Sequence, residues 1–232
     1  MEDWSLEQLQ TVPALIDQVH DRLVAAITSG DLAPGQRLTQ ESVAEMLGVS
    51  RQPVSHALQI LKRRGLLIEH GKRGLAVAPL ERERIMRLYQ IREMLDGLAA
   101  RLAAERCHSG HAPGVAIEAL KQALEAGRQL QPSANISALV AADVAFHSCL
   151  HELSGNPEIA HTIAEQWPQF MRSMGFVLGA DDRAAGIWSE HAAIVDAVLS
   201  GKADLAEGLA RAHAHNAALQ AATELPQAEA AE

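Results

Sequence analysis

The first 65 residues alternate between apolar stripes and turn signals, which predicts three short helices. Apolar residues recur every three or four positions from Leu15 to Ile27, the spacing of one buried helix face. Glycine, proline and capping residues divide the segment. The predicted elements are a helix ending at Ser29-Gly30, a turn at Pro34-Gly35, a helix from Thr39 to Gly48 and a helix from Ser50 to Gly65.

The periodicity then changes to that of short strands. Two apolar runs, Leu66–Glu69 and Leu75–Ala78, flank the basic, glycine-containing segment His70–Gly74, which predicts a β-hairpin. Pro79 ends the unit. A helix, a helix-turn-helix pair and a hairpin in succession predict a winged helix-turn-helix with a small hairpin wing over residues 1–79.

From Glu81 onward every segment has helical periodicity, which predicts an all-α bundle of six helices over residues 80–222. Pro168 falls inside the fourth segment and should kink or split it. Residues 223–232 are small, acidic and aperiodic, as expected for a disordered tail. The predicted helices are Glu81–Arg106, Gly114–Leu130, Ser133–Leu153, Pro157–Leu178, Asp182–Ser200 and Lys202–Ala222.

Composition supports a mainly α protein in a reducing compartment. Hydrophobic residues make up 48% of the chain and aromatic residues only 3%, and most of the apolar residues are the helix formers alanine and leucine. The acidic N-terminus does not resemble a secretory signal, and no uncharged apolar run is long enough to predict a membrane span. Cys107 and Cys149 are too few for a disulfide framework. We therefore expect a cytoplasmic protein without a membrane partner.

The net charge of −9 is unevenly distributed along the chain. The first 80 residues hold eight basic and nine acidic residues, so most of the excess negative charge lies in the predicted bundle. The segment from Arg51 to Arg73 contains six basic residues and a single acid, Glu69. A local basic patch of this kind is the electrostatic footprint expected of double-stranded DNA binding.

The third predicted helix has the layout of a recognition helix. Arg51, Gln52, Ser55 and His56 lie opposite its apolar stripe. Arg51 could contact guanine through two hydrogen bonds, and Gln52 could pair with adenine or a phosphate. The helix N-terminus at Ser50 offers amide donors to a phosphate.

Other predicted DNA contacts lie outside this helix. Arg37 precedes the second helix and could meet the phosphate backbone. At the hairpin tip, Gly71 would let the chain approach a groove while Lys72 and Arg73 supply charge. The alternative is a solvated basic helix in a protein-binding winged helix.

The segment Leu47–Leu58 resembles the DNA-binding domain of GntR-family transcription regulators. Here it is Leu-Gly-Val-Ser-Arg-Gln-Pro-Val-Ser-His-Ala-Leu, with Ser55-His56 where Arg-Glu is common in that family. The resemblance implies DNA contacts by Arg51 and by the wing residues His70 and Gly71.

Four side chains of the predicted bundle form a candidate metal site. Asp143 and His147 lie four residues apart on one helix, so their side chains can converge. His191 and His213 continue the apolar stripes of the last two helices. One carboxylate and three imidazoles suit zinc, with nickel, manganese or iron as alternatives. The competing interpretation is a set of unrelated core or surface histidines, and the rival ligands are His151 and His215.

The same residues resemble the FCD effector domain of FadR-type GntR regulators. The resemblance rests on Ile91–Ala100, on Asp143–His147 followed by Leu153–Asn156, and on Glu190–Ile194 with His213. It implies a bound metal and a small organic acid beside it. Arg92 matches an arginine that can face the effector, although an intrahelical pair with Asp96 is an equal alternative.

These features predict a ligand-responsive DNA-binding regulator, a repressor acting as a homodimer on a palindromic operator. The sequence predicts no catalytic residues. A metal-dependent hydrolase is one competitor, but no His-Glu-x-x-His motif accompanies the donors. A DNA-binding regulator with a purely structural metal is the other.

Overall fold

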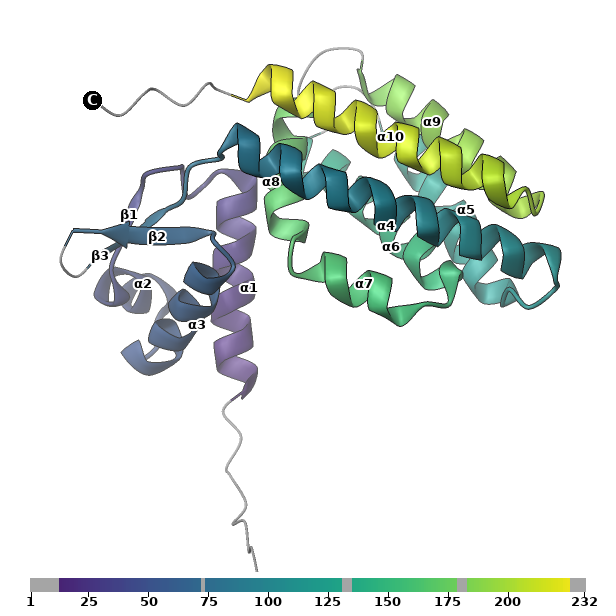
Figure 1. The fold of residues 1–232 in the computed structure, drawn as a ribbon. Coiled ribbons are helices and arrows are strands. Elements are labelled where there is room, and N and C mark those ends of the chain that lie inside the picture. Colours follow the sequence, from purple (N-terminus) through teal and green to yellow (C-terminus); the bar gives the residue numbers. More distant parts are fainter. Residues whose placement is uncertain (1–12, 72–73, 131–134, 179–182, 226–232) are drawn as a thin grey trace, which may run out of the picture. The chain divides into compact units, whose positions relative to one another are not determined.

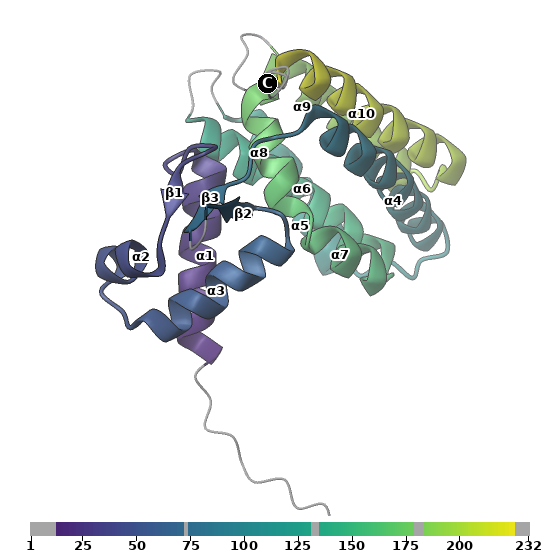
Figure 2. The same cartoon turned by 60° about the vertical axis from the view of Figure 1, so that its left-hand side comes forward.

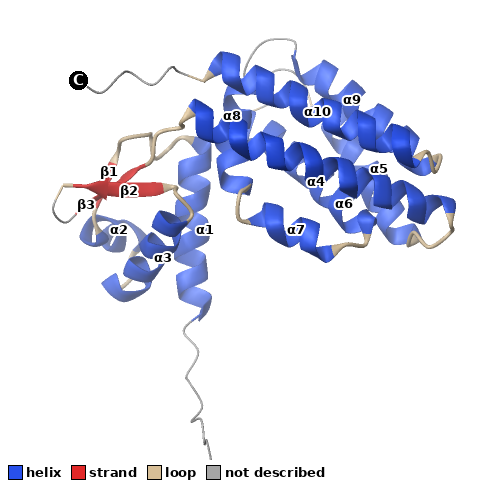
Figure 3. Ribbon diagram, viewed as in Figure 1, coloured by secondary structure: helices blue, strands red, loops and turns tan. Residues whose placement is uncertain are grey.

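The computed structural model describes residues 13–71, 74–130, 135–178 and 183–225. The chain divides into two compact units, Met1–Pro79 and Leu80–Glu232. The described residues form ten helices and one three-stranded sheet, and all strands belong to the first unit (Figures 1 and 3). The predicted mainly α fold class is therefore confirmed.

The first unit is a winged helix-turn-helix. Its strands are antiparallel in the order β1-β3-β2. The hairpin β2–β3 is the predicted wing, whereas β1 is an added strand whose Arg37 lies opposite Ala76. The elements are α1 (Pro13–Ser29), β1 (Arg37–Leu38), α2 (Gln40–Leu47), α3 (Arg51–Arg63), β2 (Leu67–His70) and β3 (Gly74–Val77).

Local capping and one apolar core fix the helix-turn-helix. Thr39 and Ser42 form a capping box at the start of α2, with the Thr39 hydroxyl accepting a 3.1 Å hydrogen bond from the Ser42 amide. Gly48 ends α2 with a φ of 65°, a conformation that favours glycine. Helix α1 packs against α3 (Figure 2). Their inward residues form the core: Val19, Leu23, Ile27, Val54, Ala57, Leu58 and Leu61.

The second unit is an all-helical bundle with seven helices among its described residues, one more than predicted. The predicted fourth helix is divided, and Pro168 lies in the first turn of the second piece, where proline is tolerated. The helices are α4 (Arg82–His108), α5 (Gly114–Arg128), α6 (Ile136–Ser154), α7 (Pro157–Ala164), α8 (Trp167–Leu178), α9 (Arg183–Leu199) and α10 (Ala203–Glu224).

The C-terminal helix is longer than the sequence pattern indicates. It continues through Glu224, and Leu225 is buried against the core, so the first residues of the predicted tail belong to the bundle. Residues 226–232 lie outside the described part of the chain, and their predicted disorder is not tested.

The bundle is built around α4, α6 and α10. Helices α4 and α10 lie side by side (Figures 1 and 2), and buried alanines from both, such as Ala100, Ala103 and Ala210, pack in one cluster. Small side chains allow two helix backbones to approach closely. Helix α6 packs against α4, α5 and α8, so side chains on its inward face reach the centre of the bundle.

Helix α6 has the length and apolar composition of a membrane span. Such a composition is also typical of a core helix, and Phe146, Leu150 and Leu153 are buried in the bundle. The same helix carries the buried Asp143, so we interpret α6 as the central helix of the bundle.

A close approach between α5 and α9 generates a stability prediction. A Cβ added at Gly127 would lie 1.9 Å from the Trp188 ring. Because overpacking a core forces side chains from their preferred positions, Gly127→Ala should lower the free energy of unfolding by about 1–3 kcal/mol in urea denaturation.

Gly208→Ala on α10 is the matched control. A Cβ there meets no atom within 4 Å, so this variant should be unchanged or more stable by about 0.5–1 kcal/mol. Equal stability of the two variants would contradict the packing argument.

Candidate metal centre and nucleic-acid interface

Four donors from three helices meet inside the bundle. Asp143 and His147 come from α6, His191 from α9 and His213 from α10. All four side chains are buried, and one ligand atom from each lies within 4.8 Å of the others. The Nε2 atoms of His147 and His191 each lie 3.6 Å from a carboxylate oxygen of Asp143.

The donor spacing fits a single ion. The Nε2 atoms of His191 and His213 are 3.1 Å apart. Two nitrogens bound at zinc's usual distance lie about 2.9 Å apart at a right angle and about 3.4 Å apart at the tetrahedral angle. The observed nitrogen separation falls between these values, and the 3.6 Å distances to the carboxylate exceed the tetrahedral value by about 0.2 Å.

Several polar atoms of the cluster have no hydrogen-bond partner. Both ring nitrogens of His147 and the Nδ1 atom of His191 are buried without one. Unsatisfied buried polar atoms are costly and call for an explanation. A cation held by the four donors would satisfy the His147 Nε2 atom directly.

A carboxylate outside the donor set orients His213. Its Nδ1 atom lies 2.7 Å from Glu190 Oε2, and the other Glu190 oxygen accepts a hydrogen bond from Asn216. This contact favours the proton on Nδ1, so Nε2, which lies within hydrogen-bond distance of His191 Nε2, carries the lone pair that could bind an ion, the arrangement usual for metal-ligating histidines.

Neither rival histidine belongs to this four-donor group. His215 has a side chain that is 60% exposed and lies 3.5 Å from Glu93. His151 is buried, and its Nε2 atom is 2.7 Å from Asp96. Asp96, His147 and His151 form a second close group, but Asp96 already accepts a hydrogen bond from Arg92 at 3.1 Å.

Arg92 forms the intrahelical pair considered from the sequence, and part of its guanidinium has no hydrogen-bond partner. Its Nε atom donates to Asp96 one turn away, which is the intrahelical pair. Its NH1 and NH2 groups are buried without a hydrogen-bond partner, and NH2 is 4.0 Å from Asp143. The guanidinium also lies 5.2 Å from the ring centroids of Trp167 and Phe170, a cation–π distance.

Burial and charge set the protonation of the cluster. Burial holds the pKa values of His147 and His191 well below the ordinary range of histidine, with Arg92 and neighbouring imidazoles adding to the effect. Burial also raises the pKa of Asp143. For Asp96, burial acts in the same direction but is outweighed by Arg92 and His151, so its pKa is lowered. The lowered pKa values favour the neutral form of both histidines, which is the form that metal binding requires.

A cavity of about 20 Å³ adjoins the donors. This volume accommodates about one water molecule. Tyr89, Arg92, Asp143 and His213 form its polar lining, and side chains of α8 such as Met174 and Val177 form its apolar wall.

The winged-helix unit exposes most of the predicted DNA contacts. Gln52 and His56 are exposed on α3. Arg51 is also exposed and forms an ion pair with Glu41 of α2. Ser55 is half-buried, and its hydroxyl accepts a 3.1 Å hydrogen bond from Gln40.

The remaining predicted contacts flank α3. Ser50 is the N-cap residue of α3, but its side chain makes no capping hydrogen bond. Arg37 is exposed on β1, and His70 and Gly71 are exposed at the end of the wing strand β2. Lys72 and Arg73 lie outside the described residues.

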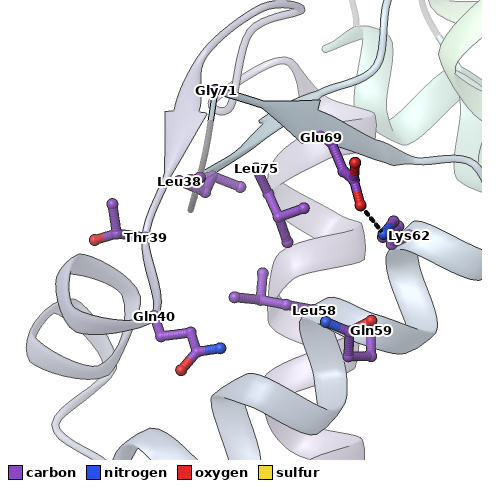
Figure 4. A pocket seen from close by; sticks show the side chains of 10 residues that line it. Leu38, Thr39, Gln40, Leu58, Gln59, Lys62, Glu69, Gly71 and Leu75 are labelled. Carbon is purple, nitrogen blue, oxygen red and sulfur yellow. Dashed lines mark hydrogen bonds and ion pairs between the residues drawn. The ribbon is translucent and has the colours of Figure 1, made fainter.

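The structure places four further polar side chains beside the predicted DNA contacts. A surface cavity of about 230 Å³ lies between α3 and the wing, and Gln40, Gln59, Lys62 and Glu69 line it (Figure 4). Gln59 and Lys62 follow Ser55 at intervals of four and three residues, so helical periodicity could have placed them on the same face. No local pattern could have paired Arg51 with Glu41.

Together, the two units define a class of protein: a winged-helix DNA-binding unit joined to a helical bundle with a cluster of buried metal-type donors. A family model described as bacterial regulatory proteins of the gntR family matches residues 15–77, and the FCD domain model matches residues 87–216. The chain belongs to the GntR family of bacterial transcription regulators, among members with an FCD domain.

Relatives and solved structures agree with this assignment. A probable D-xylose utilization operon transcriptional repressor of Paenarthrobacter nicotinovorans is 30% identical over 85% of this chain and 84% of its own. The repressor NanR of Enterobacter sp. is 28% identical over 86% and 82%. The structure of E. coli McbR/YncC shares the fold, with a TM-score of 0.74, 20% identity and coverage of 87% and 94%.

The lowered histidine pKa values predict how stability depends on pH when a chelator is present. In the unfolded chain His147 and His191 take up protons near pH 6.5, whereas in the folded protein they stay neutral to lower pH. The unfolded state then binds more protons, so the free energy of unfolding should fall as pH drops from 7 toward 5.

The variant His191→Gln should flatten this dependence in urea denaturation. Val198→Ala, at a buried position on the same helix, lowers stability without removing a histidine and should keep the wild-type slope. A His191→Gln curve parallel to that of wild type would contradict the conclusion that the pKa of His191 is lowered in the folded protein.

Proposed function

We propose that this regulator is a cytoplasmic, metal-dependent repressor whose operator affinity responds to a small organic acid. The observation that carries the proposal is the convergence of Asp143, His147, His191 and His213 in a buried cluster with unsatisfied ring nitrogens. These four side chains would hold the ion, with zinc favoured and nickel, manganese or iron as alternatives. The ion would supply a Lewis-acidic position for a ligand carboxylate.

Arg92 supports an anionic effector. The carboxylates around the donors are Asp96, Asp143 and the half-exposed Glu190, and Arg92 is the cation beside them. A divalent ion would balance their excess of two negative charges, so the case for an anion rests on the guanidinium of Arg92. Arg92, with two buried groups lacking hydrogen-bond partners, is the side chain suited to bind the second end of such a ligand.

The size of the cavity supports a conformational response. Its volume of about 20 Å³ is too small for an organic acid. Binding would therefore displace neighbouring side chains, including Met174 and Val177 of α8. The acid would change operator affinity to the extent that it prefers the displaced arrangement.

We further propose that the protein acts as a homodimer on a palindromic operator, because a single winged helix covers only a half-site. Helix α4 exposes an apolar stripe suited to a second copy of this chain. Ile91, Met94 and Leu98 occupy one face of the helix and are 56%, 53% and 39% exposed. Repression is proposed because NanR and the D-xylose operon regulator are named as repressors.

The competing hydrolase would need a general base beside the ion. The two nearby carboxylates outside the donor set are both engaged, Asp96 with Arg92 and His151 and Glu190 with His213 and Asn216. This arrangement favours a regulator without catalytic residues over an enzyme. A regulator with a purely structural metal is separated from our proposal by the second experiment below.

The metal proposal predicts a change in thermal stability. Wild-type protein stripped with chelator should gain stability when zinc, nickel, manganese or iron(II) is restored, by about 2.7 kcal/mol at 100 times the dissociation constant. Asp143→Asn and His191→Gln should lose this gain, because each removes one donor.

His215→Gln is the matched control, since it removes an exposed histidine from α10. It should keep the full gain, and native mass spectrometry of the same samples should show one ion per chain in a dimer. Full stabilisation of Asp143→Asn by metal would contradict the proposed ligand set.

The effector proposal predicts that the acid releases DNA through Arg92. With metal bound, fluorescence anisotropy on a palindromic duplex selected by the wild-type protein should show weaker binding when mono- or dicarboxylic acids are added. Arg92→Gln should bind the duplex like wild type but respond at least 10-fold less to the acid, because glutamine lacks the charged guanidinium that can bind a carboxylate through two hydrogen bonds.

Arg92→Lys, which keeps a charge beside Asp96, should respond to an intermediate degree. Metal stabilisation without any carboxylate response would favour the structural-metal alternative. Equal affinity for the palindromic and a scrambled duplex would contradict sequence-specific DNA binding by this protein.

A further inference from the structure

Two basic side chains on the exposed face of α3 are each paired with a carboxylate from another element. Arg51, in the first turn, pairs with Glu41 of α2. Lys62, in the last turn, pairs with Glu69 of the wing strand β2 at 2.5 Å (Figure 4). The four side chains are 67%, 72%, 37% and 73% exposed in that order.

These pairs lie at the two ends of one helical stripe. Arg51, Ser55, Gln59 and Lys62 follow each other at intervals of four, four and three residues, so they share the face that would meet DNA. Between the two cations the stripe carries only neutral hydrogen-bonding groups.

Such pairs contribute little to folding. Exposed ion pairs are screened by solvent and typically stabilise a protein by less than about 1 kcal/mol. The Lys62 ammonium lowers the pKa of the Glu69 carboxyl, so this acid is ionised at neutral pH. The two carboxylates therefore place negative charge on a surface that must approach phosphates.

Non-specific and specific DNA binding respond differently to this arrangement. Binding to any duplex depends on cations that neutralise phosphates and release counterions. A cation that already has a carboxylate partner gains little by exchanging it for a phosphate. A guanine edge, in contrast, offers Arg51 two directional hydrogen bonds that a phosphate in an arbitrary register does not reproduce.

We propose that Glu41 and Glu69 are specificity-determining residues that weaken binding to non-cognate DNA more than binding to the operator. Each carboxylate competes with phosphate for a cation of α3. This inference rests on the DNA-binding role of the winged helix and is independent of the metal and the effector.

The test compares full-length wild type with Glu41→Gln, Glu69→Gln and the double variant. Fluorescence anisotropy is measured on a random-sequence duplex and on a duplex that the wild-type protein selects from a random library, over about 50 to 200 mM potassium chloride. Each single variant should bind the random duplex about 2- to 5-fold tighter. The plot of log affinity against log salt should steepen by about 0.9 per released cation.

Affinity for the selected duplex should change less than 2-fold, so each substitution should lower the ratio of specific to non-specific affinity. Glu45→Gln is the matched control, because Glu45 is exposed one turn further along α2 and its removal changes the net charge equally. Thermal melts should show that all variants are folded, as expected for exposed positions.

Two results would overturn the proposal. One is a Glu41→Gln affinity for random DNA no higher than that of Glu45→Gln. The other is loss of affinity for the selected duplex with random binding unchanged, which would mean that Glu41 orients Arg51 toward the base. Wild-type preference for the selected duplex tests the DNA-reading role separately, so the two failures are distinguishable.

Discussion

The bundle depends on a conflict between an apolar interior and the polar groups placed at its centre. Asp143, His147, His191 and His213 are buried where α6, α9 and α10 meet, and several of their atoms have no hydrogen-bond partner. Burial of such atoms is unfavourable unless a partner is supplied. The ion that we propose would supply such a partner inside the bundle.

The surrounding contacts orient the proposed metal ligands and leave part of the Arg92 guanidinium without a hydrogen-bond partner. Glu190 fixes the ring orientation of His213, and Asp96 holds the Nε atom of Arg92. The remaining guanidinium nitrogens have no hydrogen-bond partner, and they lie beside a cavity large enough for only a water molecule. Ligand binding in so confined a space must move side chains, which is how a small molecule can favour one helix arrangement over another.

A different electrostatic constraint applies to the winged-helix unit. A protein with a net charge of −9 must bind a polyanion through a small basic surface. On one stripe of its recognition helix, Arg51 and Lys62 are each paired with a carboxylate from a neighbouring element. General attraction to phosphates is thereby limited, and the hydrogen-bonding side chains between the cations carry more of the discrimination among sequences.

Local sequence determined much of the secondary structure of this protein. Helical periodicity, the Thr39 cap, Gly48 and the glycine-tipped hairpin define the winged helix, because capping and turn chemistry act within a few residues. The four-residue interval of Asp143 and His147 placed them on one face for the same reason. Only the tertiary structure decided that His191 and His213 reach that face, that Arg92 lies 4.0 Å from Asp143 of α6, and that Glu41 and Glu69 pair with Arg51 and Lys62. These contacts join residues far apart in the chain or on different elements, and their distances depend on how the elements pack, which no local pattern encodes.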